Sequence, residues 1–570
     1  MLRRVPVSLR SLVDFRGGGG GGGPYLSAWT DRGMGSDDQL HGHNAAPYIT
    51  SVRWFSGIRN MSRKQSTAYM GMLKKARSAR EAMNILKNIE GEGFIPNVYN
   101  YSAAISKCAR DGKLNEAKKV FRQMQQNKVL PNEFTFNSLI HACAKAGKDE
   151  EALQFLRDME EKHTLLPNVH CYSAAISACE KAGNWEKAVE LLREMHRRGI
   201  EPNVISYNAT ISACEKGGRT DKALELLVEM EAKGIKPDLI TFNAAISACE
   251  KGGAKHTDTA LSLFEAMRNR EIWPNVITYS ASISACEKGG AKYTQTALDL
   301  FDEMRGYGVK PTVITYSALI SACEKGGEGY TGTALRLFDE MREYGVKPND
   351  ITYNATISAC EKGGAKYTQT AFDLFDEMKE YRVEPNDITY NALISACEKG
   401  GADFTQTALR LFGEMKEFGI DPDEITYRAI TKSCFDTEQY PEAVEKAKEA
   451  VSGGFVVPLD PNDKEWDLHE MTEAQACMLL ADALIASAES ESFRDIILIT
   501  GRGNQSREGP VLVSKVPEFL KNLAGIELTE HIQHGRVNLG AFVITKKVLQ
   551  KWAKSDDFTR FQALMTGKGQ

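Results

Sequence analysis

The sequence of 570 residues lacks several features that would place it in a common class of protein. It contains no run of 18 or more apolar residues, so no transmembrane helix is expected. It has no Cys-X-X-Cys pair, and its cysteines therefore give no indication of a zinc site. It also lacks a strong charge, since the formal net charge is −5. This mild balance leaves nucleic-acid binding open, because the cations of such a protein can be concentrated on one face.

Ten of the twelve cysteines recur at intervals of 35, 36, 35 and 35 residues, followed by five intervals of 37. They are Cys108, Cys143, Cys179, Cys214, Cys249, Cys286, Cys323, Cys360, Cys397 and Cys434. Helices that pack side by side lie about 8–10 Å apart, whereas a disulfide needs Cα atoms within about 7 Å. We therefore expect these cysteines to be reduced and buried as small packing residues.

The first 65 residues differ from the rest of the chain and are predicted to be a transit peptide with a disordered, glycine-rich leader. Residues 1–16 contain four arginines and a single acid, Asp14, and seven glycines follow at 17–23. The stretch "RWFS" at residues 53–56 resembles a mitochondrial processing site. We therefore expect an organelle protein, with the mitochondrion preferred over the chloroplast, and an ordinary disordered tail is the alternative.

The remaining pattern repeats every 35–37 residues, which is typical of a solenoid. Each unit contains two segments with apolar residues at helical spacing, separated by glycine and closed by proline. In the unit at residues 387–423, the apolar stripes are Tyr390, Ile394 and Cys397, then Ala408, Leu411, Phe412 and Met415. Neither helix can bury its stripe alone, so the fold class predicted is an α-solenoid of paired antiparallel helices.

The predicted array covers residues 66–458, with nine clear repeats at 98–423 and a worn repeat at each end. The 37-residue units carry two extra residues between their helices, which should leave the stacking intact. Strand and helix patterns then alternate over residues 459–552, which predicts a small α/β domain. Residues 553–570 are expected to form a tail.

The repeats resemble the pentatricopeptide-repeat family of RNA-binding proteins. The match is carried by the "TYN" or "TYS" helix openings, the "A-L-x-L-F-x-E-M" second helices and the "G-V-K-P-N" closures. The tetratricopeptide pattern W…LG…Y is absent. The resemblance implies a superhelix whose units each read one base of single-stranded RNA with two or three side chains.

Every clear unit has one cation near the end of its first helix, in register with the repeat. These residues are Arg110, Lys145, Lys181, Lys216, Lys251, Lys288, Lys325, Lys362 and Lys399. One cation per unit matches one phosphate per nucleotide, and such binding weakens steeply with salt. The alternative is that each cation meets the dipole of its helix C-terminus, which would hold equally in a protein-binding solenoid.

The fifth residue of each unit is polar, although its neighbours are apolar. It is Ser102, Asn137, Ser173, Asn208, Asn243, Ser280, Ser317, Asn354 or Asn391. These side chains can hydrogen-bond a Watson–Crick edge, although a solvated face would show similar variation. The resemblance implies that the last residue of each unit is the partner: Asn132, Asn168, Asn203, Asp238, Asn275, Thr312, Asn349, Asn386 and Asp423.

The family's pairing tendencies imply the sequence 5′-A-Y-A-U-Y-?-A-Y-U-3′, where Y is cytosine or uracil. The Ser280/Thr312 unit has an uncommon pair and remains unassigned, as does Arg428 in the worn last unit. The second residue, which in the family wedges beside the base, is mostly isoleucine: Ile205, Ile240, Ile277, Ile314, Ile351 and Ile388.

The C-terminal segment resembles the small MutS-related (Smr) domain through "DLH" at 467–469 and "TGRG" at 500–503. The resemblance implies a nucleic-acid site formed by Asp467, His469, Thr500, Gly501, Arg502 and Gly503. His469 would act as general acid or base with Asp467 orienting it, and Arg502 and Arg507 could hold phosphates. Trp466 stands where the family usually has leucine, and Glu470 where it usually has glycine. The added carboxylate would repel a phosphate, which weakens the case for catalysis.

We expect a single-stranded RNA-binding protein of an organelle that acts in transcript processing or stabilisation. Its C-terminal domain would bind or cleave nucleic acid, DNA included. No tightly bound metal or cofactor is expected, although Mg²⁺ or Mn²⁺ could assist cleavage. The alternatives are a site-directed endoribonuclease and a protein-interaction solenoid without an RNA role.

Overall fold

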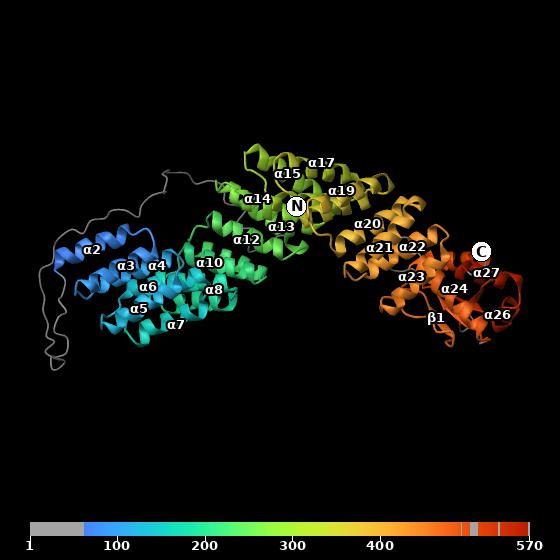
Figure 1. Ribbon diagram of the computed structural model, residues 1–570, viewed down its shortest axis with the longest axis horizontal. Coiled ribbons are helices and arrows are strands. Elements are labelled where there is room, and N and C mark those ends of the chain that lie inside the picture. The colour runs from blue at the N-terminus through green and yellow to red at the C-terminus, as the bar shows by residue number, and fades with distance from the viewer. Residues whose placement is uncertain (1–61, 492, 502–510, 534–535, 568–570) are drawn as a thin grey trace. The chain divides into compact units, whose positions relative to one another are not determined.

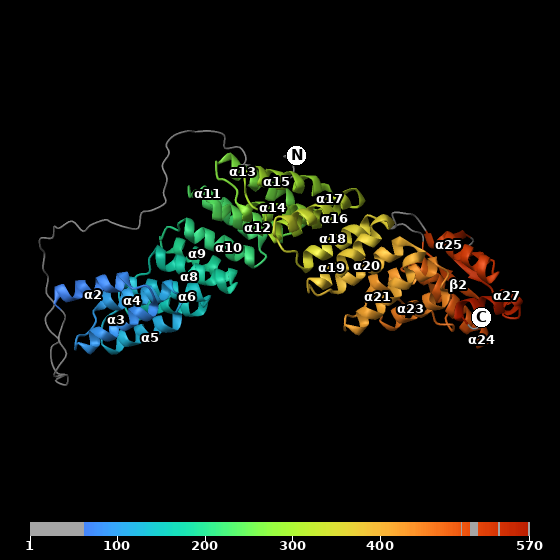
Figure 2. The ribbon, with the colours of Figure 1, turned by 45° about the horizontal axis from the view of Figure 1, so that its top comes forward.

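The computed structural model describes residues 62–491, 493–501, 511–533 and 536–567. Most of the predicted leader and the residues Arg502, Gly503 and Arg507 lie outside this range. The chain divides into two compact units, residues 1–289 and 290–570. Figures 1 and 2 show helical pairs in both units and a small sheet near the C-terminus. The predicted α-solenoid followed by a small α/β domain is confirmed.

The helices alternate between the first and the second helix of a repeat. The first helices are α2 (Arg63–Lys75), α4 (Val98–Arg110), α6 (Glu133–Ala146), α8 (Val169–Ala182), α10 (Val204–Lys216), α12 (Leu239–Lys251), α14 (Val276–Gly289), α16 (Val313–Gly326), α18 (Asp350–Lys362), α20 (Asp387–Gly400) and α22 (Glu424–Asp436). The second helices are α3 (Ala79–Gly91), α5 (Leu114–Gln126), α7 (Asp149–Glu161), α9 (Trp185–Arg197), α11 (Thr220–Ala232), α13 (Thr257–Asn269), α15 (Thr294–Gly306), α17 (Thr331–Glu343), α19 (Thr368–Glu380), α21 (Thr405–Glu417) and α23 (Tyr440–Ser452).

Within each compact unit, consecutive first helices pack on one another, and each second helix packs against its own first helix and the next one. The ring of Phe338 on α17 meets the buried ring of Tyr353 on α18 edge to face, with centroids 5.2 Å apart. Such a pair adds about 0.5–1.5 kcal/mol beyond its buried area. The hydroxyl of Tyr353 donates to Glu377 on α19 at 2.9 Å, which satisfies its buried polar end. The same edge-to-face pair of phenylalanine and tyrosine recurs in other repeats, so it stabilises the packing of one repeat on the next.

All twelve cysteines lie in the described part of the chain, where they are buried and free of disulfides. Cys143, for example, is fully buried on α6. Burial raises the pKa of its thiol to about 12, because the thiolate would be desolvated. The cysteines therefore serve as packing residues, as their spacing predicts.

The first helices begin at capping residues that the repeat supplies once per unit. Asn386 is typical: its side-chain oxygen accepts from the backbone N–H of Thr389, and the Thr389 hydroxyl accepts from the Asn386 N–H. This reciprocal capping box satisfies two backbone donors at the helix start. The last residue of each unit is thus fixed at the N-terminus of the next first helix.

The two extra residues of the 37-residue units form a short 3-10 turn before the second helix. These turns are η2 (Ala254–His256), η3 (Ala291–Tyr293), η4 (Glu328–Tyr330), η5 (Ala365–Tyr367) and η6 (Ala402–Phe404). The turn folds its aromatic ring back over the preceding glycine. A Cβ atom on Gly363 would lie 2.4 Å from the Tyr367 ring and 2.8 Å from Thr331. Gly364 follows with φ +80°, a conformation that favours glycine. Both glycines of the repeated "KGG" are therefore required by geometry.

The C-terminal domain contains a four-stranded sheet in the order β1-β2-β4-β3. Its elements are β1 (Glu465–Asp467), α24 (Glu473–Glu489), β2 (Ile496–Ile499), α25 (Val511–Phe519), the π-helix η7 (Leu520–Ala524), β3 (Thr529–Gln533), β4 (Arg536–Ile544), α26 (Lys546–Trp552) and α27 (Asp556–Thr566). Strands β1 and β2 are parallel, with Asp467 opposite Ile499, whereas β4 runs antiparallel to both of its neighbours. The carboxyl ends of β1 and β2 therefore meet at one edge of the sheet.

The small domain packs directly on the last repeat, because α24 contacts both α22 and α23. Tyr440 and Ala447 of that repeat share one apolar core with Trp466 and Leu480 of the domain. Helix α27 joins this core through Phe561, which is fully buried. The segment 553–570, predicted to be a tail, thus contributes a packed helix. Its signal was weak because only a few apolar residues face the core.

None of the helices in the described part of the chain is long and apolar enough to cross a membrane. Among the same residues, no group of three or more His, Cys, Asp or Glu side chains is placed to hold a metal ion.

The packing around Gly363 predicts opposite effects for the same substitution at two glycines. Gly363→Ala should destabilise the chain by about 1–3 kcal/mol, because the new methyl group collides with Tyr367 and Thr331. Gly413→Ala is the matched control within α21, where no atom lies within 4 Å of the added Cβ. It should be neutral or stabilise the helix by up to about 1 kcal/mol. Denaturant unfolding followed by circular dichroism measures both, and an equal effect at the two sites would contradict this packing.

Candidate nucleic-acid interface

The structure brings the fifth and last residues of a unit into direct contact. The Nδ2 of Asn354 donates to Oδ1 of Asn386 at 3.0 Å. Asn391 and Asp423 form the same bond at 3.0 Å, and Asn208 and Asp238 form it at 2.9 Å. We call each such couple a reading pair. Two residues that are about 30 positions apart in sequence are therefore joined by a hydrogen bond.

In eight of the nine predicted reading pairs, both residues belong to the same compact unit. In five of these eight pairs the two side chains are hydrogen-bonded directly. The five are Ser102–Asn132, Asn208–Asp238, Asn243–Asn275, Asn354–Asn386 and Asn391–Asp423. Ser173–Asn203 and Ser317–Asn349 are connected through a hydroxyl group instead. In the ninth pair, Ser280 belongs to the first compact unit and Thr312 to the second.

A bridging hydroxyl, the third residue of the following unit, was missed by the sequence analysis. Thr389 shows the role: its hydroxyl lies 2.6 Å from Oδ1 of Asn354 and 3.1 Å from Oδ1 of Asn386. The equivalent residues that bridge a pair are Thr135, Ser206, Thr241, Thr278, Thr352, Thr389 and Thr426. The signal was the constant threonine of "ITYN", which looked like a simple helix former.

The pair Asn137 and Asn168 shows what the bridge does. Cys171 stands at the bridging position, and no hydrogen bond joins Asn137 to Asn168 among the described residues. Asn168 still caps α8 by accepting from the N–H groups of His170 and Cys171. Its Nδ2 instead lies 3.5 Å from Glu133. The hydroxyl, rather than the cap alone, therefore holds a reading pair together.

A large apolar side chain is exposed at the second position of nearly every unit. The column comprises Tyr99, Phe134, Ile205, Ile240, Ile277, Ile314, Ile351, Ile388 and Ile425, each more than half exposed. At the N-terminal end, a cavity of about 330 Å³ contains two members of this column together with a reading pair. It is lined by Tyr99, Ser102, Arg110, Asn132 and Phe134, among others. Exposed apolar side chains, a hydrogen-bonded polar pair and a cation thus converge at one place.

The predicted phosphate-binding cations lie in the last turn of the first helices, and most are paired with a carboxylate. Lys216 meets Glu180 at 2.8 Å, and Lys251 meets Glu215 at 2.5 Å. The remaining pairs are Lys288–Glu250, Lys362–Glu324 and Lys399–Glu361. In each case the glutamate belongs to the preceding unit. We call these five pairs the Glu–Lys ladder.

The first three cations differ from the rest. Among the described residues, no carboxylate pairs with Arg110, Lys145 or Lys181, and Lys145 donates to the backbone carbonyl of Arg110 at 2.8 Å. Partial desolvation lowers the pKa of His141, and the positive charges of Lys145, Lys181 and Arg110 lower it further. The charges of these three cations therefore all act on His141, and none of the three forms an ion pair with a carboxylate in the part of the chain that the structure describes.

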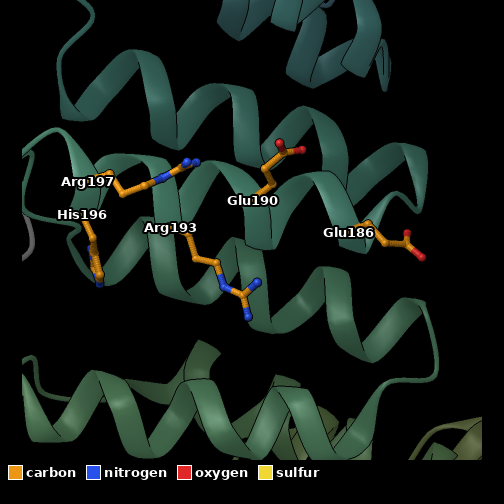
Figure 3. A pocket seen from close by; sticks show the side chains of 5 residues that line it. All are labelled: Glu186, Glu190, Arg193, His196 and Arg197. Carbon is orange, nitrogen blue, oxygen red and sulfur yellow. The ribbon is translucent and has the colours of Figure 1, made fainter.

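A second hollow lies along α9 and contains none of the predicted site residues. It is lined by Glu186, Glu190, Arg193, His196 and Arg197, all from α9 (Figure 3). Acids and bases are mixed there, and His196 already contacts Glu229 at 3.1 Å. This surface offers no concentrated charge for a nucleic acid.

In the C-terminal domain, the predicted residues Asp467, His469, Thr500 and Gly501 meet at the carboxyl edge of β1 and β2. Oδ1 of Asp467 lies 2.6 Å from Nδ1 of His469 and accepts the His469 backbone N–H at 3.1 Å. Gly501 has φ +73°, and a Cβ there would lie 3.0 Å from the His469 Cβ. Thr500 is buried and bonds the Gly540 carbonyl. The absence of a side chain therefore lets Gly501 lie close against His469.

The two departures from the family pattern have different consequences. Trp466 is buried, and its indole N–H donates to the Asp460 carbonyl at 2.8 Å, so it fills the core without an unsatisfied group. Glu470 is largely exposed, with Oε1 3.6 Å from Nε2 of His469. The hydrogen bond that the His469 ring donates to Asp467, followed by the charges of Asp467 and Glu470, raises the pKa of His469. His469 therefore stays protonated to a higher pH than an ordinary histidine.

Asp467→Asn should lower the pKa of His469, because the charged acceptor at 2.6 Å is replaced by a neutral one. Since the folded-state pKa is raised, the stabilisation from this pair is present at low pH and is lost as pH rises through that pKa. Titration of the His469 ring signals by NMR measures the shift. Glu470→Gln is the control and should lower the pKa less, because Glu470 lies farther away. An unchanged pKa in Asp467→Asn would refute the coupling.

Comparisons with known proteins agree with the architecture. Family models for the pentatricopeptide repeat match residues 96–180, 170–200, 190–326, 328–399 and 388–420, and a Smr domain model matches 466–547. A search of curated proteins found no match.

Two solved structures are similar to parts of the chain. The pentatricopeptide repeat protein PPR10 from maize is 22% identical, with 81% of this chain and 64% of that chain covered and a TM-score of 0.40. The PPR domain of Arabidopsis thaliana PRORP1, solved with tRNA, is 19% identical, with 30% and 90% covered and a TM-score of 0.28. The chain thus spans less than two thirds of the length of PPR10. On the family models, the chain belongs to the pentatricopeptide-repeat family and carries a C-terminal Smr domain.

Proposed function

We propose that the array binds single-stranded RNA, with one base read by each clear repeat, and that it acts in transcript processing or stabilisation. The observation that carries this proposal is the cavity in which Ser102, Asn132, Tyr99 and Phe134 converge. Aromatic rings can stack on a base and contribute about 1–3 kcal/mol each. The hydrogen-bonding pair beside them faces the edge of that base. The arginine-rich leader supports action in an organelle, the mitochondrion in preference to the chloroplast.

The hydrogen bonds of the last residue indicate which bases it accepts. Oδ1 of Asp423 accepts from the backbone N–H and the hydroxyl of Thr426, and Oδ2 accepts from Asn391. Oδ2 retains acceptor capacity, which suits the N3–H of uracil. Oδ1 of Asn386 is engaged in the same way, but its Nδ2 has no partner among the described residues. That amide is a donor, which suits N3 of cytosine.

The first test is selection of RNA from a random single-stranded pool by the full chain. The expected consensus is A-Y-A-U-Y, one unassigned base, then A-Y-U, read 5′ to 3′. Binding should weaken as salt rises, because the cations replace counterions on the phosphates. Failure to enrich any RNA, even at low salt, would refute the proposal. The array would then be interpreted as a protein-interaction solenoid.

An exchange of one oxygen for one amide tests the reading pairs. Asp423→Asn should shift the preference at the last position from uracil toward cytosine by about tenfold, which corresponds to about 1.4 kcal/mol. The reciprocal variant Asn386→Asp should shift its own position toward uracil. Both residues cap a helix equally well, so stability should change little. Competition binding with single-base RNA variants measures the shifts, and a change at a different position would contradict the assignment.

A second function, site-directed endoribonuclease, is favoured by the Asp467–His469 contact. The raised pKa of His469 keeps it protonated, which suits donation of a proton to a leaving oxygen. His469→Ala should then abolish cleavage of a bound RNA while leaving its affinity within about twofold. Incubation of labelled RNA with each protein, with and without Mg²⁺ or Mn²⁺, measures both properties. Unchanged cleavage would remove His469 from the mechanism, and absence of cleavage by the unaltered chain would leave the domain a binding module.

A further inference from the structure

The repeats fall into two classes according to what lies beside their cation. The first class comprises the three units at residues 98–203. In the first two of these units an alanine, Ala109 or Ala144, precedes the cation. Among the described residues, no carboxylate of the ladder pairs with Arg110, Lys145 or Lys181. From Glu180 onward, a glutamate precedes each lysine in the repeated "CEK". The chain therefore changes its charge pattern partway along the array, while its reading pairs continue.

In the Glu–Lys ladder the acid is the more buried partner. The Glu215 side chain is 15% exposed and the Lys251 side chain 42% exposed. The ammonium thus remains open to solvent, with a carboxylate directly behind it. A phosphate that contacts this ammonium also lies roughly twice as far from the carboxylate, so repulsion cancels roughly half of the attraction. Phosphate contact in a ladder unit therefore contributes roughly half of what it would beside a cation without a carboxylate.

The units at residues 98–203 have the opposite properties. No carboxylate pairs with their cations among the described residues. Of their three exposed side chains at the second position, two are aromatic, Tyr99 and Phe134. Aromatic rings stack on any base, and uncompensated cations attract any phosphate. We call residues Tyr99, Arg110, Phe134, Lys145 and Lys181 the docking end.

We propose that the two segments divide the work on one RNA: the docking end holds RNA largely irrespective of sequence, and the Glu–Lys ladder makes the remaining repeats depend on correct bases. The ladder glutamates are thus specificity-determining residues that contact no base. An RNA with wrong bases gains little from the ladder units, because their lysines are already compensated. This inference rests on the proposed RNA binding and adds how the array rejects other RNAs.

Two sets of substitutions test the division. Glu215→Gln, Glu250→Gln, Glu324→Gln and Glu361→Gln together remove four ladder charges while retaining a hydrogen-bond acceptor for each lysine. Affinity for a shuffled RNA should rise at least tenfold, whereas affinity for the RNA selected by the full chain should rise less. The ratio of the two affinities therefore falls. The salt dependence for shuffled RNA should become steeper.

The matched control changes the same net charge on the second helices. It consists of Glu190→Gln, Glu225→Gln, Glu265→Gln and Asp339→Asn, exposed acids that each pair with a cation three residues away. It should leave the affinity ratio within about twofold of the unaltered chain. If the control matches the ladder variant, net charge alone explains the effect and the proposal is overturned.

The second set is Arg110→Gln, Lys145→Gln and Lys181→Gln, made together. It should weaken selected and shuffled RNA by similar factors and reduce the salt slope by about 2, because about 0.7 is expected for each phosphate contact on a single strand. A loss confined to the selected RNA would overturn the docking role. If the unaltered chain enriches no RNA, the proposed function fails. If it enriches RNA but the ladder variant keeps its ratio, only the present inference fails.

Discussion

Each helical pair leaves an apolar face that only the next pair can cover, and this requirement for burial underlies the other features of the chain. The Phe338–Tyr353 contact joins successive units, and the Tyr353 hydroxyl needs Glu377 because burial would otherwise leave it unsatisfied. The C-terminal domain uses the same solution. Helix α24 covers the end of the last repeat, so the array ends in a shared core rather than in an exposed apolar surface.

Stacking also explains why the same side chain caps a helix and contacts the preceding first helix. Asn386 begins a helix with the same carboxamide that holds Asn354 in place. Only a side chain that can cap a helix is suitable there, which restricts the last residues to asparagine, aspartate and threonine. Within this set, an oxygen in place of an amide changes a donor into an acceptor without disturbing the cap. The last residue of a unit can thus change its hydrogen-bonding character at little cost in stability.

Electrostatics then separates stretches of the chain that have nearly the same backbone. The lysines of the Glu–Lys ladder are each paired with a carboxylate, whereas Arg110, Lys145 and Lys181 form no such ion pair within the described residues, although the net charge of the whole chain is mildly negative. At the other end, Asp467 supports a positive charge on His469, and the exposed Glu470 adds to this effect. The distribution of charge, rather than its sum, carries the functional information.

The periodicity of the sequence was enough to predict the helical pairs and the buried cysteines. A 35–37-residue repeat with apolar residues at helical spacing is compatible with few folds other than a helical solenoid. The resemblance to the Smr domain implied that Asp467, His469 and Thr500 form one site, and the parallel pairing of β1 and β2 brings these residues to the same edge of the sheet. Only the tertiary structure decided the partners of individual side chains. These partners belong to different repeats or domains. Examples are the bridge formed by Thr389, its absence at Cys171, the pairing of Lys251 with Glu215 and the packing of α27 on the last repeat. Such contacts depend on how neighbouring units are placed in space, and a pattern read along a single chain does not contain that placement.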